Sequence, residues 1–258
     1  MKQGIIIVNH GTMDSEVRSR TLDDFAYSIS DRIPEADVVC VYTNGEVRKG
    51  LRETSDEKPQ NLKAAILSMK KRGVSSLVII STDIHDGDDY RKLKEETVGL
   101  AALFSDVSIS VPLLYADKDF EVTARAMHGA FSELVGDDVL ILITTGHKTD
   151  GAEELRSFET SLKKHINNGY VATLHGEKKL YKVIKELKQS GFEEGRVVFV
   201  PLEFMAGEGI ENEVSQEYTD LVQKLTDEGY KVESIFKGLA EYDEFQRLYM
   251  RHFYDSMR

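Results

Sequence analysis

The chain has 258 residues, of which 45 are acidic and 33 are basic, giving a formal net charge of −12 at pH 7. A nucleic-acid partner would require a basic face, so this balance argues against one. With 41% hydrophobic and 30% charged residues, the composition is typical of an ordinary soluble globular protein and excludes a disordered chain.

A single cysteine, Cys40, lies in an apolar segment, so no disulfide can form within the chain. This fits a reducing compartment, and a free cysteine in such surroundings is usually part of a core. The apolar run near the N-terminus is too short for a secretory signal, and no stretch approaches the roughly 20 apolar residues that span a bilayer. We therefore expect a cytoplasmic protein without a membrane partner, and a homo-oligomer stays open.

Strand and helix patterns alternate through the first half of the chain. Short apolar runs bounded by turn residues predict buried strands, and apolar side chains three to four residues apart predict helices between them. Pro34 ends the first helix. The predicted strands of this half are 5–8, 36–42, 76–81 and 107–111, and the predicted helices are 15–33, 47–52, 61–72 and 88–104.

The pattern restarts after a helix predicted over 119–134. The second half has predicted strands at 139–143, 170–174, 196–200 and 231–235, and predicted helices at 150–166, 177–189, 212–227 and 242–257. Repeated strand–helix–strand units of this spacing require a mostly parallel sheet with helices on both faces. We expect an α/β protein of two pseudo-symmetric, doubly wound parallel-sheet domains, residues 1–120 and 121–258, with a cleft between them.

The clearest single feature is the apolar run 140–143, which stops at Gly146 and His147. Such a run is typical of a buried parallel strand, and open α/β sheets bind ligands beyond the carboxyl ends of their strands. The start of the chain holds a near copy, since residues 5–8 are followed by His10 and Gly11. Two strands that end in histidine and glycine indicate a duplication whose halves face one site.

Four of the seven histidines lie within four residues after the end of a predicted strand. Imidazole is the commonest metal ligand near neutral pH and can also accept a proton. Acidic side chains occur in the same loops, so both kinds of group could line one site. The histidines are His10, His85, His147 and His175, and the acids are Asp83, Asp86, Asp88, Glu208 and Glu211.

Structural roles stay open for most of these residues. His10 could cap a turn before a helix, His85 and His175 could be solvated loop residues, and Glu208 and Glu211 could be favoured by a helix macrodipole. The chain has no GxGxxG, GxxxxGK[ST], GxSxG or CxxC motif. This excludes the usual nucleotide-binding loops, the hydrolase elbow and a structural zinc or iron–sulfur site. The residues therefore indicate a metal-handling site that uses no nucleotide.

A series of short motifs runs along the chain: Ile7-Val8-Asn9-His10-Gly11-Thr12, Thr43-Asn44-Gly45, Gly87-Asp88-Asp89-Tyr90, Val111-Pro112-Leu113-Leu114, Gly146-His147, Val200-Pro201-Leu202 and Ala206-Gly207-Glu208. In order and spacing they resemble the class II tetrapyrrole chelatases, most closely the anaerobic sirohydrochlorin cobaltochelatases of the CbiK type. The resemblance implies two pseudo-symmetric domains around a cleft. It also implies insertion of a divalent metal, typically Co²⁺, into sirohydrochlorin on the oxygen-independent route to cobalamin.

The resemblance also suggests site residues. His147 matches the first essential histidine of these chelatases, and His175 falls where they usually have a glutamate. Gly209 falls where they have a second metal-binding histidine, with Glu208 replacing the aspartate before it. The implied catalytic residues are His147, His175 and Glu208, and Glu211 joins them as a metal ligand.

A tetrapyrrole site also needs apolar walls and polar anchors for the carboxylates of the macrocycle. We expect the substrate-binding residues to be His10, His85, Leu114, Tyr115, Lys148 and Met205. Two other functions stay open: a tetrapyrrole or metal carrier without turnover, and a ferrochelatase or nickel chelatase on the same fold.

Overall fold

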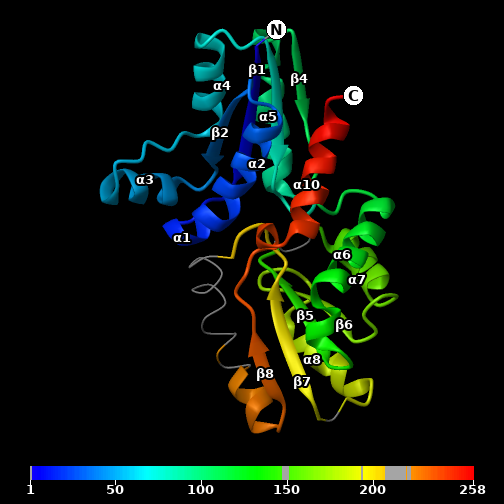
Figure 1. The fold of residues 1–258 in the computed structure, drawn as a ribbon. Helices are drawn as coiled ribbons and strands as arrows, with labels where there is room; N and C mark the ends of the chain where they lie inside the picture. Colours follow the sequence, from blue (N-terminus) through cyan, green and yellow to red (C-terminus); the bar gives the residue numbers. More distant parts are fainter. Residues whose placement is uncertain (1, 147–150, 193, 207–218, 220–221) are drawn as a thin grey trace. The chain divides into compact units, whose positions relative to one another are not determined.

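The computed structural model describes the whole chain except residues 1, 147–150, 193, 207–218 and 220–221. The chain forms two compact units (Figure 1): residues 1–113 with 246–258 make the N-terminal unit, and residues 114–245 make the C-terminal unit. Each unit contains one four-stranded sheet, as the alternating patterns predicted. Among the described residues, no helix combines the length and the apolar character needed to cross a membrane.

The sheet of the N-terminal unit has the order β2-β1-β3-β4, and all neighbouring strands are parallel. The central strand β1 is apolar along most of its length because both of its faces are covered, and Ile5, Ile6 and Ile7 have no exposed surface. The strands are β1 (Gln3–Asn9), β2 (Asp37–Tyr42), β3 (Ser76–Ser81) and β4 (Asp106–Ile109).

Helices connect these strands. The predicted helix 15–33 is one continuous helical segment with a π-helical turn, η1, in its middle. The helix predicted over 88–104 is shorter in the structure than predicted. It is capped by Gly99, and a separate 3₁₀ turn follows. The helical elements are α1 (Ser15–Arg18), η1 (Ser19–Asp23), α2 (Asp24–Arg32), α3 (Gly45–Thr54), α4 (Leu62–Lys71), α5 (Asp88–Val98) and η2 (Ala101–Leu103).

The C-terminal unit repeats the same plan. Its parallel sheet has the order β6-β5-β7-β8, so β5 takes the place of β1 and β7 that of β3. Residues 222–227 are helical, and most of the predicted helix 212–227 before them lies outside the described residues. The elements are α6 (Asp117–Val135), β5 (Val139–Thr144), α7 (Ala152–Leu162), β6 (Gly169–Thr173), α8 (Leu180–Gln189), β7 (Arg196–Pro201), β8 (Lys231–Ser234) and the 3₁₀ turn η3 (Leu239–Glu241).

The closing helix α10 (Asp243–Ser256) belongs to the N-terminal unit from Gln246 onward. Its Tyr249 ring packs edge-on against Phe25, with ring centres 6.3 Å apart, and the Tyr249 hydroxyl donates to the carbonyl of Thr82 at 3.3 Å. The units of the structure therefore differ from the predicted halves, 1–120 and 121–258. An amphipathic pattern predicts that a helix buries one face, but it does not say against which sheet.

Candidate functional site

The carboxyl ends of β5 and β6 stay paired beyond the last residues of the two strands. The backbone nitrogen of Leu174 donates to the carbonyl of Thr144 at 3.0 Å, and that of His175 donates to the carbonyl of Thr145 at 2.9 Å. His175 therefore lies beside Thr145. In the sequence, Thr145 precedes His147 by two positions. The His175 side chain is exposed, as is expected of a residue that meets a ligand at this edge of a sheet.

The Thr173 side chain separates the two loops that carry these histidines. A Cβ atom at Gly146 would lie 3.0 Å from the Cβ and Cγ2 atoms of Thr173, and one at Gly176 would lie 2.6 Å from its Oγ1 atom. Gly146 also has a φ of +54°, a conformation that favours glycine. The residue before His147 and the residue after His175 thus both pack their backbones directly on one buried side chain.

Glu203, just after β7, ties that strand to the exit of β5. Its Oε1 atom accepts hydrogen bonds from the Thr144 hydroxyl at 2.7 Å, the Thr145 backbone nitrogen at 2.9 Å and the Thr145 hydroxyl at 3.1 Å. A carboxylate oxygen with several donors is held firmly, because charge-assisted hydrogen bonds are the stronger kind. Our sequence reasoning missed this residue, although it is the one acid in the segment 196–206.

The N-terminal unit has a corresponding tie between β1 and β3. The Asn9 side-chain nitrogen donates to the Thr82 hydroxyl at 2.7 Å, and that hydroxyl donates to the carbonyl of Val8 at 2.9 Å. The Asn9 side-chain oxygen accepts from the backbone nitrogen of Gly11 at 2.8 Å. These bonds fix the loop that carries His10 in the same way that Glu203 fixes the loop before His147.

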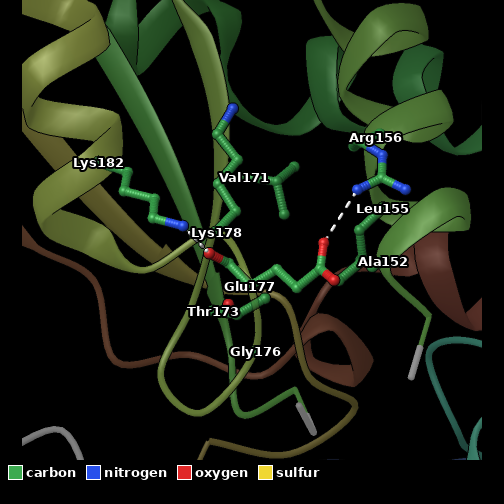
Figure 2. Close-up of a pocket in the computed structure, with 9 residues that line it drawn as sticks. All are labelled: Ala152, Leu155, Arg156, Val171, Thr173, Gly176, Glu177, Lys178 and Lys182. Carbon is green, nitrogen blue, oxygen red and sulfur yellow. Dashed lines mark hydrogen bonds and ion pairs between the residues drawn. The ribbon is translucent and has the colours of Figure 1, made fainter. Parts of the chain in front are cut away.

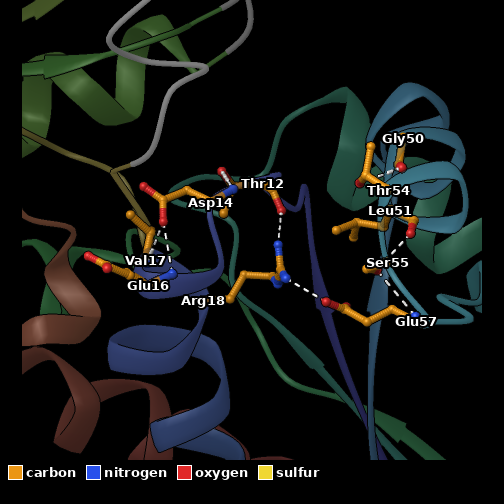
Figure 3. Close-up of polar contacts among 10 residues, drawn as sticks. All are labelled: Thr12, Asp14, Glu16, Val17, Arg18, Gly50, Leu51, Thr54, Ser55 and Glu57. Atoms are coloured by element: carbon orange, nitrogen blue, oxygen red, sulfur yellow. Dashed lines mark hydrogen bonds and ion pairs between the residues drawn. The ribbon is translucent and has the colours of Figure 1, made fainter.

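A buried arginine, Arg18, also supports the loop that carries His10 (Figure 3). Arg18, which is 5% exposed, donates to the Thr12 carbonyl at 2.8 Å and pairs with Glu57 at 2.6 Å. The cap of α1 is Asp14, whose carboxylate accepts from two backbone nitrogens of the first turn. The residue that caps the helix after this loop is therefore Asp14 and not His10.

His10 instead contacts Asn44, and the contact fixes which ring nitrogen carries the proton. The Asn44 side-chain oxygen accepts from the backbone nitrogens of Glu46 and Val47, which makes Asn44 the cap of α3. The amide nitrogen of Asn44 therefore faces His10 Nε2, 2.9 Å away. Because that nitrogen can only donate, Nε2 accepts, and the neutral ring carries its proton on Nδ1.

His10 also lines a cavity of about 470 Å³ at the carboxyl ends of β1 and β2. Burial raises the pKa of Tyr42 in the wall of this cavity, so its phenol stays protonated at neutral pH. Burial likewise raises the pKa of Cys40, on the same strand β2, to about 12, which fits a structural thiol. Besides His10, the polar lining includes Tyr42, Asn44, Arg48, Lys63 and Lys92.

The acidic loop around His85 does not form a carboxylate cluster. Asp86 pairs with Lys94 at 3.2 Å, and Asp88 pairs with Arg91 at 2.7 Å, so both carboxylates already have cationic partners. His85 is half-buried, and its Nδ1 atom is buried without a hydrogen-bond partner in the part of the chain that the structure describes. This argues against the fully solvated alternative for His85.

Of the remaining predicted residues, the structure describes three apolar or aromatic ones and leaves the others outside the described ranges. Leu114 has no exposed surface, Met205 is 9% exposed and Tyr115 is 45% exposed, so Tyr115 presents the most surface of the three. In the described ranges, no three His, Cys, Asp or Glu side chains come together as a metal-binding group. His147, Lys148, Glu208 and Glu211 lie outside the described residues.

Comparison with known proteins identifies a family and a curated relative. The family described as "Cobalt chelatase (CbiK)" matches residues 3–258. The relative is a sirohydrochlorin cobaltochelatase of Salmonella typhimurium, which is 19% identical over 258 residues, covering 100% of this chain and 97% of the relative.

Solved structures agree on the fold. A sirohydrochlorin chelatase, SirB, from Bacillus subtilis subspecies spizizenii in complex with cobalt matches with a TM-score of 0.67 and 13% identity, over 99% of this chain and 95% of the other. SirB from Bacillus subtilis with Fe³⁺ also matches with a TM-score of 0.67, at 15% identity over 99% and 96% of the two chains. Both matches confirm the predicted two-domain α/β chelatase fold.

Proposed function

Because the chain belongs to the cobalt chelatase (CbiK) family, we propose that it inserts a divalent metal ion into sirohydrochlorin without the help of a nucleotide. The observation that carries the proposal is the paired exit of β5 and β6, where His175 bonds to Thr145 just before His147. His147 follows Thr145 by two residues in the sequence, and a pair of histidine ligands would suit a late first-row dication, which prefers nitrogen donors.

Insertion exchanges one M²⁺ ion for the two pyrrole N–H protons of the free macrocycle, so the site needs weak metal ligands and proton acceptors. We assign His147 and His175 as the ligands that present the metal. Glu208 and Glu211 would complete the ligand set or take up the two protons, since carboxylates can do either. The firm hold of Glu203 on Thr144 and Thr145 would limit movement of the His147 loop while the metal is transferred.

Co²⁺ is the metal that we propose. The curated relative is a cobaltochelatase, whereas one related structure holds cobalt and another Fe³⁺, so iron is the main competitor. Parallel reactions with Co²⁺, Fe²⁺ and Ni²⁺, on sirohydrochlorin and on protoporphyrin, separate these choices. Preference for Fe²⁺ or Ni²⁺ would contradict the cobalt assignment and leave the chelatase assignment standing.

The direct test is a rate measurement. Purified protein with sirohydrochlorin and Co²⁺ should produce the absorption spectrum of the metallated macrocycle far faster than the mixture without protein. His147→Ala should lower this rate by about two to four decades, the scale of losing a central catalytic group. His128→Ala is the matched control, because His128 is an exposed histidine of α6 in the same unit. An unchanged rate in the His147 variant would exclude its role.

A carrier function is the second candidate, and Gly209 favours it, because related chelatases are expected to have a histidine there. A carrier would bind sirohydrochlorin or Co²⁺ tightly and give no acceleration over the uncatalysed mixture. Equilibrium binding and rate measurements on the same preparation therefore distinguish the carrier from the enzyme.

A further inference from the structure

The C-terminal unit contains a cavity that is lined by none of the residues assigned to the metal ligands or proton acceptors of the proposed reaction. Its volume is about 220 Å³, and it lies between α7, β6 and the loop that follows His175 (Figure 2). This is several times the roughly 30 Å³ that one water occupies, so a short chain of heavy atoms fits. The residues used below are Ala152, Leu155, Arg156, Val171, Thr173 and Lys182.

The inner wall of the cavity is apolar, with one buried hydroxyl. Leu155 and Val171 are 6% and 2% exposed, and both point into the space that Figure 2 shows. Thr173 is 5% exposed, and its Oγ1 atom has no hydrogen-bond partner among the described residues. This atom packs closely against Gly176, where an added Cβ would lie 2.6 Å from it, so the hydroxyl is closed off and the accessible inner wall is apolar.

The rim of the cavity already holds a carboxylate of the chain itself. Arg156 pairs with the Glu177 carboxylate at 3.1 Å, and Lys182 donates to the Glu177 carbonyl at 2.8 Å. The ion pair is weak, because Arg156 is 62% exposed and Glu177 is 49% exposed. A ligand carboxylate could therefore displace Glu177 from Arg156 at little cost.

Lys178 does not compete for that ligand. Its ammonium group lies 2.7 Å from both carboxylate oxygens of Glu159 and 3.0 Å from Glu186. Its charge is thus already balanced, and it contributes its alkyl stem to the wall. The cationic group that remains available to a ligand at the rim is Arg156, with Lys182 beside it.

We propose that this cavity binds an aliphatic carboxylate, with its chain against Leu155 and Val171 and its carboxylate on Arg156 in place of Glu177. Two sources share this chemistry: a carboxylate side arm of the tetrapyrrole, which rests on the proposed function, and a free small carboxylic acid. The wall residues Gly176 and Glu177 directly follow His175. A carboxylate bound in the cavity would therefore also stabilise the loop that carries His175, a proposed metal ligand.

The first experiment needs neither metal nor tetrapyrrole, so its result stands even if the proposed function fails. Sodium pentanoate is titrated into the full-length ¹⁵N-labelled protein, with pentanamide as the neutral control. We expect saturable shifts of the Leu155, Val171 and Thr173 amides and about tenfold weaker binding of pentanamide. No saturable shift, or equal affinity for both compounds, would overturn the proposal.

Variants test the two halves of the cavity separately. Arg156→Gln should weaken pentanoate binding about tenfold, and Ala152→Leu should abolish it by filling the space. Arg125→Gln is the matched control, because Arg125 is 68% exposed in an ion pair on α6 of the same unit. Unchanged binding in Arg156→Gln, with its spectrum otherwise preserved, would exclude the carboxylate contact.

Binding of metal-free sirohydrochlorin then identifies the source of the carboxylate. If a side arm enters the cavity, Ala152→Leu weakens sirohydrochlorin binding and pentanoate competes with it. If Ala152→Leu loses pentanoate binding but binds sirohydrochlorin normally, the side-arm source is excluded and a free small carboxylate is the occupant.

Discussion

The Oε1 atom of Glu203 lies 2.9 Å from the backbone nitrogen of Thr145 and accepts its hydrogen bond. The two residues are 58 positions apart and belong to neighbouring strand exits. The bond joins the end of β7 to the segment that leads into Gly146 and His147. The Glu203 carboxylate thus fixes the backbone at the end of β5, just before Gly146 and His147.

Glu203→Ala should destabilise the C-terminal unit by about 1–3 kcal/mol, because it leaves the donors of Thr144 and Thr145 without their acceptor. Glu203→Gln should cost less, since its amide oxygen can still accept. Urea denaturation of both variants measures the difference, and Co²⁺ titration should show weaker binding in the alanine variant. Identical midpoints and slopes for wild type and Glu203→Ala would contradict this role.

Gly176→Ala should destabilise the protein by about 1–3 kcal/mol through overpacking, because the new Cβ would lie 2.6 Å from Thr173 Oγ1. The same clash should displace His175 and weaken Co²⁺ binding. Gly129→Ala in α6 is the control, since a Cβ there meets nothing within 4 Å and should stabilise the helix by about 0.5–1 kcal/mol. Equal unfolding temperatures for the two variants would show that the Thr173 contact is unimportant.

Stability should fall in acid partly through Glu159, which is 7% exposed. Burial opposes its ionisation, but hydrogen bonds from Lys163, Lys178 and the Val171 nitrogen outweigh it and hold the pKa of Glu159 below its ordinary value of 4.5. A lowered folded-state pKa means that this stabilisation is present above pH 4.5 and is lost as the pH falls through the folded-state value.

Glu159→Gln should therefore cost about 1.5–3 kcal/mol at pH 7 and progressively less as the pH drops below 4.5. Urea denaturation at a series of pH values measures the two curves. Glu186→Gln is the matched control: Glu186 is 46% exposed and also pairs with Lys178, so its loss should change stability by at most about 0.5 kcal/mol. A cost for Glu159→Gln that does not change with pH would contradict the assignment.

Asn44→Ala should cost about 1 kcal/mol through loss of the α3 cap, whereas Asn44→Asp should keep the cap and most of the stability. In the wild type, ¹⁵N spectra of the imidazole should show the proton of neutral His10 on Nδ1, because Asn44 donates to Nε2. In Asn44→Ala, the Nε2–H form of His10 should become populated. A wild-type ring with its proton on Nε2 would contradict the proposed orientation of the Asn44 amide.

The sequence predicted the sheets better than the contacts between their ends. Apolar runs such as 140–143 and residues 5–8 are strong signals, because strands covered on both faces must be apolar along their length. The role of Glu203 depends on which strand neighbours β5, and that pairing is set by tertiary structure. The same is true of Thr173, whose importance comes from two glycines that reach it from separate loops.

The sequence predicted where the histidines lie relative to the strands, but it did not predict the contacts that decide their roles. His10 and His175 do follow strands, as predicted, and the structure adds that Asn44 holds one ring while a backbone bond to Thr145 places the other residue. The neighbours that decide a role are distant in the sequence, so spacing alone cannot identify them. The assignments of His147, Glu208 and Glu211 stay predictions.

Residues 246–258 pack with a sheet whose strands all precede residue 114. During synthesis, residues 114–245 leave the ribosome before the helix that completes the other unit. The C-terminal unit can therefore reach its final fold first. Until α10 is available, the surface around Phe25 in the N-terminal unit stays exposed to solvent. A chain truncated after residue 245 should therefore keep a protease-resistant second unit, while its first unit still needs protection from aggregation.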